Sequence, residues 1–172
     1  NTTSCVGSTS SFCVTATGSG LSYQWLVSPS GCSGTWTVIV NSAPYSGVNT
    51  ACLTINPTSP LMNGYAYQCV VSGTCTPAAI SSCGILTVNT PVAITAQPAN
   101  STICAGSSTS FTIAASGTSP TYQWQESING GTSWNNISNG GVYSGATTTT
   151  LALTGVTAGM SANQYRVIVT GT

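Results

Sequence analysis

The chain reads Ser-Tyr-Gln-Trp at residues 22–25 and Thr-Tyr-Gln-Trp at residues 121–124. Landmarks around the two copies recur at the same spacing, apart from one residue fewer between Trp124 and Trp134 than between Trp25 and Trp36. Cys5, Phe12 and Tyr67 of the first copy thus match Cys104, Phe111 and Tyr165 of the second. The period, about 98 residues, is the size of a small domain rather than of a solenoid unit. The sequence therefore predicts two tandem domains, residues 1–90 and 91–172.

The chain of 172 residues is almost free of charge. Glu126 is its only acidic residue, Arg166 is its only basic residue, and it has no His, whereas ordinary domains carry about a quarter charged residues. A polybasic nucleic-acid site and electrostatic docking to anionic lipid are thereby excluded. Because a net charge near zero favours association, we expect the chain to sit in an assembly. A neutral, glycan-coated monomer is the alternative.

Few side chains are suited to catalysis or to metal binding. With no His and a single carboxylate, a Ser nucleophile has no base, and glycoside hydrolysis lacks its second acid. The cysteines form no Cys-x-x-Cys pair for zinc, and calcium needs more carboxylates. The sequence therefore predicts no enzyme activity, no cofactor and no metal site. Glu126 and Arg166 are expected to form a structural ion pair on adjacent strands.

The cellular setting follows from cysteine content and hydropathy. Eight cysteines in a chain of this size point to an oxidising compartment. No apolar run approaches the roughly 18 residues of a membrane span, and no signal peptide is present, which fits the mature form of a secreted chain. We expect an extracellular or cell-surface protein with no membrane span.

Most segments alternate apolar and polar residues with period two, which is typical of half-buried strands separated by turns. Strands at this spacing suggest an all-β sandwich. The order of landmarks resembles two tandem immunoglobulin-like (Ig-like) β-sandwich domains, with Trp25 and Trp124 in the cores and Tyr67 and Tyr165 as corner tyrosines. No helix is expected beyond a single turn over residues 161–165.

Several short stretches also resemble a known group of repeats. They are Ile94-Thr95-Ala96-Gln97-Pro98, Cys104-Ala105-Gly106-Ser107, Tyr122-Gln123-Trp124-Gln125, Gly130-Gly131-Thr132-Ser133-Trp134 and Gln164-Tyr165-Arg166-Val167. These stretches are similar in sequence to the tandem Ig-like repeats of very large secreted surface proteins of Bacteroidota-type bacteria. That resemblance implies extracellular, non-enzymatic, stalk-like or adhesive roles, and it supplies no catalytic residues.

The repeat is out of phase with its domains. The second copy has a leading strand over residues 92–97 whose equivalent is missing from the first, and the first has a final strand over residues 85–88 whose equivalent is missing from the second. A sandwich without its last strand exposes unpaired backbone. Either the chain continues, as in a segment of a longer repeat protein, or a neighbour completes it by strand addition, which builds head-to-tail fibres.

All eight cysteines are candidates for disulfides: Cys5, Cys13, Cys32, Cys52, Cys69, Cys75, Cys83 and Cys104. Cys13, Cys32, Cys52 and Cys69 have no cysteine counterpart in the second copy, so they are expected to pair among themselves. A Cys13–Cys52 bridge on the outer face competes with a Cys13–Cys69 bridge between the sheets. Cys104 has no partner in its own domain, and we expect it to form an inter-domain or inter-subunit disulfide, or one with residues beyond Thr172.

Two sets of residues point to glycans. Asn1, Asn100 and Asn136 begin sequons and are candidate glycosylation sites. Trp36, Trp134, Tyr45 and Tyr143 recur in both copies and either stack on sugars or pack at the edge of each sandwich.

The leading functional hypothesis is a structural subunit or repeat of an extracellular filament or adhesive surface fibre. Its partners would be other copies in a homopolymer or neighbouring repeats, joined by strand complementation, disulfides or both. The alternative is a carbohydrate- or ligand-binding accessory module of a larger secreted protein.

Overall fold

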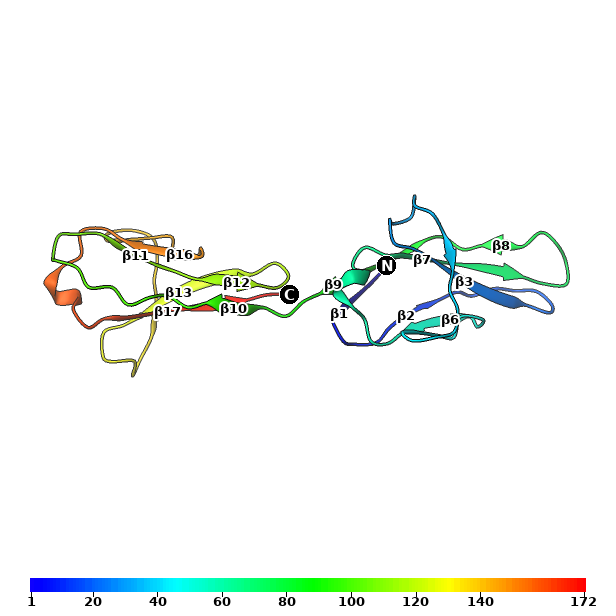
Figure 1. Ribbon diagram of the computed structural model, residues 1–172, viewed down its shortest axis with the longest axis horizontal. Coiled ribbons are helices and arrows are strands. Elements are labelled where there is room, and N and C mark those ends of the chain that lie inside the picture. The colour runs from blue at the N-terminus through cyan, green and yellow to red at the C-terminus, as the bar shows by residue number, and fades with distance from the viewer. The chain divides into compact units, whose positions relative to one another are not determined.

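The computed structural model describes residues 1–172, which divide into two compact units, Asn1–Thr90 (unit 1) and Pro91–Thr172 (unit 2). Both units are all-β, and each has one short 3-10 turn, Pro60–Met62 (η1) or Ala158–Met160 (η2) (Figure 1). A single turn was expected over residues 161–165. The turn of unit 2 lies just before that stretch, and a strand begins within the stretch, at Gln164.

Unit 1 is a sandwich of two sheets. One sheet has the order β1-β9-β7-β3-β4, with β8 also pairing with β7, and the other has the order β2-β6-β5. The strands are β1 (Thr2–Cys5), β2 (Ser10–Cys13), β3 (Ser22–Ser28), β4 (Thr37–Val38), β5 (Tyr45–Ser46), β6 (Cys52–Ile55), β7 (Ala66–Ser72), β8 (Ala79–Ile80) and β9 (Gly84–Asn89).

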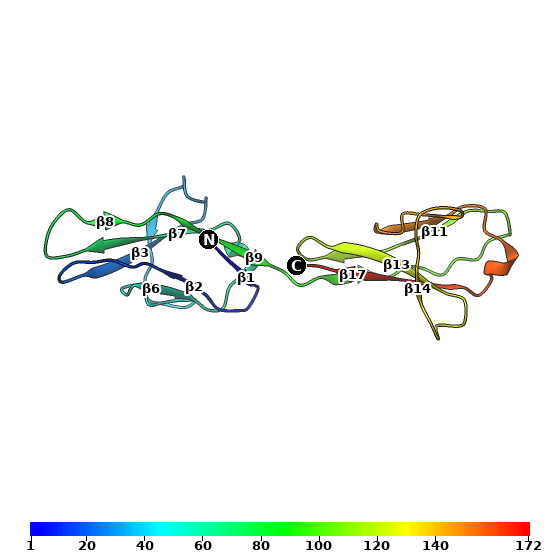
Figure 2. The same ribbon diagram turned by 180° about the vertical axis from the view of Figure 1, so that it is seen from behind.

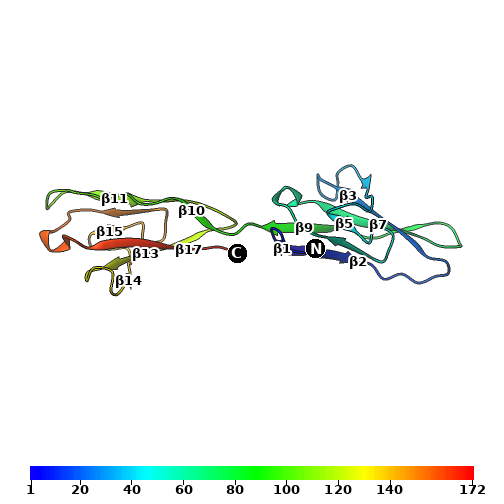
Figure 3. The ribbon, with the colours of Figure 1, turned by 60° about the horizontal axis from the view of Figure 1, so that its bottom comes forward.

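Unit 2 repeats this plan with fewer strands. Its sheets have the orders β14-β13-β17 and β11-β16-β15, and β10 pairs with β12 in a separate ribbon. The strands are β10 (Ala93–Ala96), β11 (Thr109–Thr112), β12 (Ala114–Ser116), β13 (Thr121–Ser127), β14 (Asn135–Asn136), β15 (Tyr143–Ser144), β16 (Thr150–Leu153) and β17 (Gln164–Thr170). Figure 3 shows β11 and β17 of this unit in opposite layers.

The repeated Tyr-Gln-Trp motif holds the centre of each core. Trp25 and Trp124 are buried, and their Nε1–H groups donate to the carbonyl oxygens of Thr50 (3.0 Å) and Thr148 (2.9 Å). These bonds satisfy the indole donor, which would otherwise be costly to bury. The preceding Gln24 donates from Nε2 to the carbonyl oxygen of Ile39 (3.1 Å), and Gln123 donates to that of Ile137 (2.9 Å). The motif thus ties β3 and β13 to the residues that directly follow β4 and β14.

The two units differ in their outer strands. Unit 1 has no counterpart of β10, and unit 2 has no counterpart of β9. Unit 1 nevertheless begins with a strand that the sequence did not predict. This strand, β1, pairs in parallel with β9, with Thr2 opposite Leu86 and Cys5 opposite Asn89 (Figure 2). The matching stretch of unit 2, residues 101–104, has no such partner and is not a strand.

Candidate functional site

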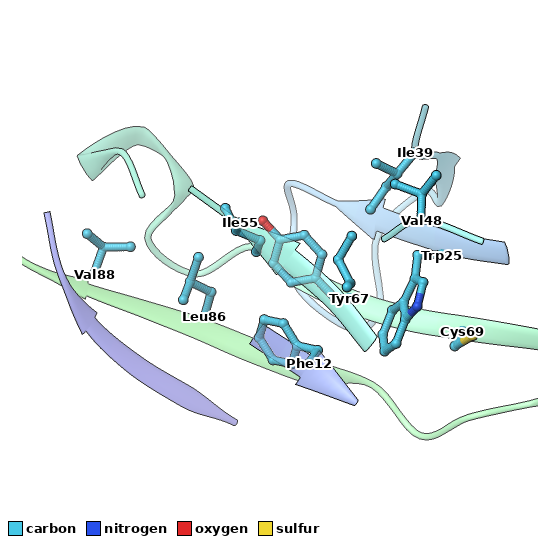
Figure 4. Close-up of a cluster of buried hydrophobic side chains, with 10 residues drawn as sticks. Phe12, Trp25, Ile39, Val48, Ile55, Tyr67, Cys69, Leu86 and Val88 are labelled. Atoms are coloured by element: carbon cyan, nitrogen blue, oxygen red, sulfur yellow. The ribbon is translucent and has the colours of Figure 1, made fainter. Parts of the chain in front are cut away.

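In unit 1, β9 lies over one end of the core. It runs antiparallel to β7, with Gly84 opposite Tyr67, and buries Leu86 and Val88 (Figure 4). The Leu86 backbone is held on both sides, since its N–H donates to Tyr65 O and its carbonyl oxygen accepts from Gly64 N–H, both at 2.8 Å. The strand therefore closes the sheet and the core together.

In unit 2 the same place is an open groove of about 500 Å³, which we call the unit 2 groove. Strand β17 pairs with β13 alone and leaves its other edge without a strand. The apolar side chains that line the groove are Ile103, Phe111, Leu153, Val156, Met160 and Tyr165. Most of them match residues that pack around β9 in unit 1, as Phe111 matches Phe12 and Tyr165 matches Tyr67.

The unit 2 groove keeps the shape of the filled site. The rings of Phe12 and Tyr67 stack at 4.9 Å and 29° in unit 1, and those of Phe111 and Tyr165 stack at 5.0 Å and 28° in unit 2. Ala162 has a φ of 69°, a left-handed conformation that is rare outside glycine. Its counterpart is Gly64, which has a φ of 85° and bonds to β9. The groove is therefore formed before a strand fills it.

Unit 1 has an open groove of its own, of about 550 Å³, which we call the unit 1 groove. It is lined by Val14, Gly18, Leu21, Val71, Gly73 and Ile80, among others. In unit 2 the counterparts of Gly18 and Gly73 are Gly117 and Gly171, and both lie against Val92, the residue before β10. The unit 1 groove thus lies where unit 2 holds its leading strand.

The expected ion pair between Glu126 and Arg166 does not form. Arg166 faces Gln125 across the strands and donates from Nε to Gln125 Oε1 at 2.8 Å. Glu126 directly follows Gln125 in β13, so its side chain points to the face of the sheet opposite to that of Gln125 and Arg166. There its Oε2 accepts a hydrogen bond from Tyr143 Oη at 2.6 Å. The expectation was wrong because adjacent strands do not ensure a common face.

Each tyrosine that the sequence analysis expected at a corner is paired with a second tyrosine, and Tyr67 lies buried in the core of unit 1. Tyr67 and Tyr45 approach through their hydroxyls at 3.5 Å, and Tyr165 and Tyr143 approach at 3.4 Å. Burial, and then the bond to Tyr45, raises the pKa of Tyr67 far above its ordinary value. Burial, and then the bond to the Glu126 carboxylate, does the same for the pKa of Tyr143. Both phenols therefore stay neutral and act structurally.

The four aromatic residues considered for sugar stacking, Trp36, Trp134, Tyr45 and Tyr143, are all half-buried. The ring of Trp134 is in contact with another side chain of its own unit. The guanidinium carbon of Arg166 lies 4.3 Å from the centroid of a Trp134 ring, and Trp134 Nε1–H donates to Gly131 O at 3.1 Å. One face of Trp134 is therefore covered within the unit. Trp36, its counterpart in unit 1, is half-buried.

Two disulfides lie in unit 1. Of the two pairings considered for Cys13, the structure has the bridge to Cys52 on the outer face, where β2 and β6 bring the two residues opposite each other. The other bridge joins Cys32 to Cys83. The expectation that Cys32 pairs within the group of Cys13, Cys52 and Cys69 was wrong.

Four cysteines expected in disulfides are free thiols: Cys5, Cys69, Cys75 and Cys104. Cys69 faces the core, where β2 presents Phe12 rather than Cys13, so no cysteine meets it. Burial raises the pKa of the Cys69 thiol, which makes it less reactive. The other three side chains are exposed and have no cysteine partner within the chain. An inter-subunit disulfide of Cys104 stays a prediction.

The three sequons lie on the surface, with Asn1, Asn100 and Asn136 all exposed. Asn1 Oδ1 accepts from Ile85 N–H at 2.9 Å, and Asn136 Oδ1 accepts from Gln125 Nε2 at 2.7 Å. Glycosylation of these residues stays a prediction.

The structure contains no cluster of three or more His, Cys, Asp or Glu side chains that could hold a metal ion. None of its helical segments has the length and apolar character needed to cross a bilayer.

Comparisons with known proteins bear on the fold. Residues 92–172 match a family model described as a domain of unknown function, DUF8696. No curated protein sequence matches the chain.

Solved structures that resemble the chain are Ig-like. They include the titin I-band fragment I67–I69 (TM-score 0.69, 16% identity, 99% of this chain and 57% of that one). The four N-terminal Ig domains of Dscam1 isoform 6.9 also match, with a TM-score of 0.65 and 19% identity over 99% of this chain and 39% of that one. A third match is Dpr2 Ig1–Ig2 in complex with DIP-Theta Ig1–Ig3, with a TM-score of 0.58 and 18% identity over 99% of this chain and 61% of that one. The chain spans less than two thirds of each of these. At such identities the likeness establishes the fold, two Ig-like β-sandwich domains.

Proposed function

We propose that the chain is a non-enzymatic structural module of an extracellular filament or adhesive surface fibre, in which Ig-like units are joined head to tail. The observation that carries this proposal is the unit 2 groove, an apolar site next to the unpaired edge of β17. An edge of this kind is a template for pairing with another strand. The partners are other copies of the chain or neighbouring Ig-like repeats.

The surface composition supports association rather than repulsion between molecules. One acid and one base in 172 residues leave almost no like-charge field to keep copies apart. The disulfides Cys13–Cys52 and Cys32–Cys83 fit an oxidising, extracellular setting. The exposed thiol of Cys104 is available for a covalent link between subunits, as a supplement to strand pairing.

The module is better suited to a fibre than to carbohydrate binding. A sugar platform needs an open aromatic face, and one face of Trp134 is covered by Arg166. Tyr143 is half-buried and hydrogen-bonded to Glu126. No observation favours a sugar site over packing at these positions.

Negative-stain imaging beside a denaturing gel, with and without reductant, tests the proposal. Filaments that fall to a 17.2 kDa band on denaturation alone indicate non-covalent joints, and a ladder that collapses only on reduction indicates disulfide joints, with Cys104→Ser as the variant to compare. A clean monomer that forms no filaments at high concentration would overturn the fibre proposal.

A further inference from the structure

We propose that an apolar sheet face of unit 1 binds the same face of a second copy of this chain, as a two-fold symmetric pair. The face, which we call the unit 1 outer face, is formed by Leu26, Trp36, Val38, Val40 and Val70. None of these residues lines either groove. The inference therefore concerns a lateral contact between molecules, which is separate from the head-to-tail joint of the proposed fibre.

Strand register places the central residues of this face side by side. Leu26 of β3 lies opposite Val38 of β4. Gln24, two residues before Leu26, lies opposite Val70 of β7. Residues directly opposite one another, and residues two apart along a strand, share one face of a sheet. Trp25 points from the other face into the core (Figure 4), so the face that holds these four residues is the outer one.

The edge of the sheet extends the apolar surface. Val38 and Val40 are 55% and 68% exposed, whereas Ile39 between them is 4% exposed and packs in the core. Trp36 is half-buried, as are Leu26 and Val70 further into the sheet. Apolar side chains that are grouped in this way on a surface mark an interaction site, whereas isolated ones are ordinary.

The matching face of unit 2 is polar, so the fold itself does not require apolar residues there. The residues at the positions of Leu26, Val38 and Val40 are Gln125, Asn136 and Ser138. Gln125 donates from Nε2 to Asn136 Oδ1 at 2.7 Å and accepts from Arg166 Nε at 2.8 Å. Unit 2 thus presents a hydrogen-bonded polar surface to solvent on the backbone positions where unit 1 presents apolar side chains.

The chemistry of the unit 1 outer face selects an uncharged, apolar partner. Glu126 and Arg166 both belong to unit 2, so unit 1 has no charged side chain. The Gln24 amide on this face already donates to the carbonyl oxygens of Trp25 and Ile39, both at 3.1 Å. A charged partner would lose its hydration here without gaining a compensating group.

A second copy of unit 1 meets this requirement. It presents the same uncharged surface, so no like charges oppose the contact, and burial of apolar side chains on both sides drives association. Two sheets that pack face to face interdigitate their side chains in this way. Because the same patch is used on both molecules, the contact closes at two copies. The polar face of unit 2 is a poorer partner, since Arg166 and its hydrogen-bonded neighbours would have to be desolvated.

Sedimentation velocity of the full chain over a range of concentrations tests this inference. The exposed thiols of Cys5, Cys75 and Cys104 are first alkylated, so that no new disulfide contributes to association. We expect a reversible dimer. The double variant Leu26→Gln with Val38→Asn introduces the residues of unit 2 and should raise the dissociation constant of the dimer at least tenfold.

Two further variants guard against a trivial loss of folding or of general stickiness. Val40→Ser alters a side chain that is 68% exposed, so it should weaken the dimer without unfolding unit 1. Leu61→Gln is the matched control, because Leu61 is 83% exposed in η1, outside the strands of this sheet, and its loss should leave the dissociation constant unchanged. A parent chain that stays monomeric at every concentration, or an equal effect of Leu61→Gln and the double variant, would overturn the inference.

Negative-stain images of the same samples separate this contact from the proposed function. Association that stops at the dimer, is lost in the double variant and forms no filaments supports the contact and overturns the fibre. Filaments that lie in pairs for the parent chain and singly for the double variant support both proposals. Filaments and association that are unchanged in the double variant leave the fibre standing and refute the contact.

Discussion

Unit 1 and unit 2 have matching cores, but a closing strand, β9, covers the core of unit 1 and no strand covers the same place in unit 2. Tyr67 is 1% exposed beneath β9, whereas its counterpart Tyr165 is half-buried beside an empty groove. Yet each of these tyrosines stacks on its phenylalanine with almost the same geometry. Strand β9 therefore covers this part of the core and does not shape it. The side chains that meet a closing strand are already positioned by the rest of the sandwich.

The units also differ in what holds their outer faces. Unit 1 carries both disulfides, and unit 2 has Thr112 and Thr150 in place of Cys13 and Cys52, with their hydroxyls 3.0 Å apart. The same pair of opposed positions is thus joined by a covalent bond in one unit and by a hydrogen bond in the other. We expect unit 1 to be the more stable of the two.

The largest expected effect is that of truncating the phenylalanine under the closing strand. Phe12→Ala should cost about 3–5 kcal/mol, because the ring is buried between Tyr67 and β9 and its loss leaves a cavity. Phe111→Ala should cost less, because its ring faces the unit 2 groove and is half-buried. Denaturant unfolding followed by hydrogen exchange in each unit measures the two free energies. Equal losses would contradict the view that β9 buries this site.

Removal of each disulfide should have the next largest effect. The double variants Cys13→Ala with Cys52→Ala, and Cys32→Ala with Cys83→Ala, should each destabilise unit 1 by roughly 2–4 kcal/mol, because both bridges close long loops. Unit 2 is the internal control and should unfold at an unchanged denaturant concentration. A matched loss in both units would mean that they do not unfold independently.

The alternation of side chains explains which parts of this comparison were predictable. The repeat, the two core tryptophans and the outward orientation of Cys13 all follow from period-two patterns in the sequence. The Cys32–Cys83 bridge does not, because neither residue lies in a strand and the spatial approach of the segments that hold them is not encoded in local periodicity. The parallel pairing of β1 with β9 was missed for a similar reason, since it joins the two ends of unit 1.

The sites were predicted less well than the fold. The missing closing strand of unit 2 is visible in the alignment of the two copies, but the grooves depend on side-chain packing. The sequence signal for the unit 1 groove is the pair Gly18 and Gly73, since glycines at matching places in both copies mark a close approach of the backbone.

A smaller effect is expected from pH. Burial raises the pKa of Tyr67 and of Tyr143 above the ordinary value of about 10. The stability that each neutral phenol contributes is therefore complete below that pH and is lost as the pH rises above it. Unfolding free energies measured from pH 8 to 11 should fall, and Tyr67→Phe or Tyr143→Phe should flatten the decline in its own unit. An unchanged slope in both variants would refute the assignment.

The smallest expected effect concerns the only two charged side chains. Arg166→Gln places the residue of unit 1, Gln68, at this position and removes the contact with Trp134, which should cost about 0.5–1 kcal/mol at such an exposed site. Glu126→Gln should act separately through Tyr143, because the two charges lie on opposite faces of the sheet. A double-mutant cycle should therefore give a coupling near zero. A clear coupling would instead mean that the two charges pair in solution, and the strand register would then need to be revised.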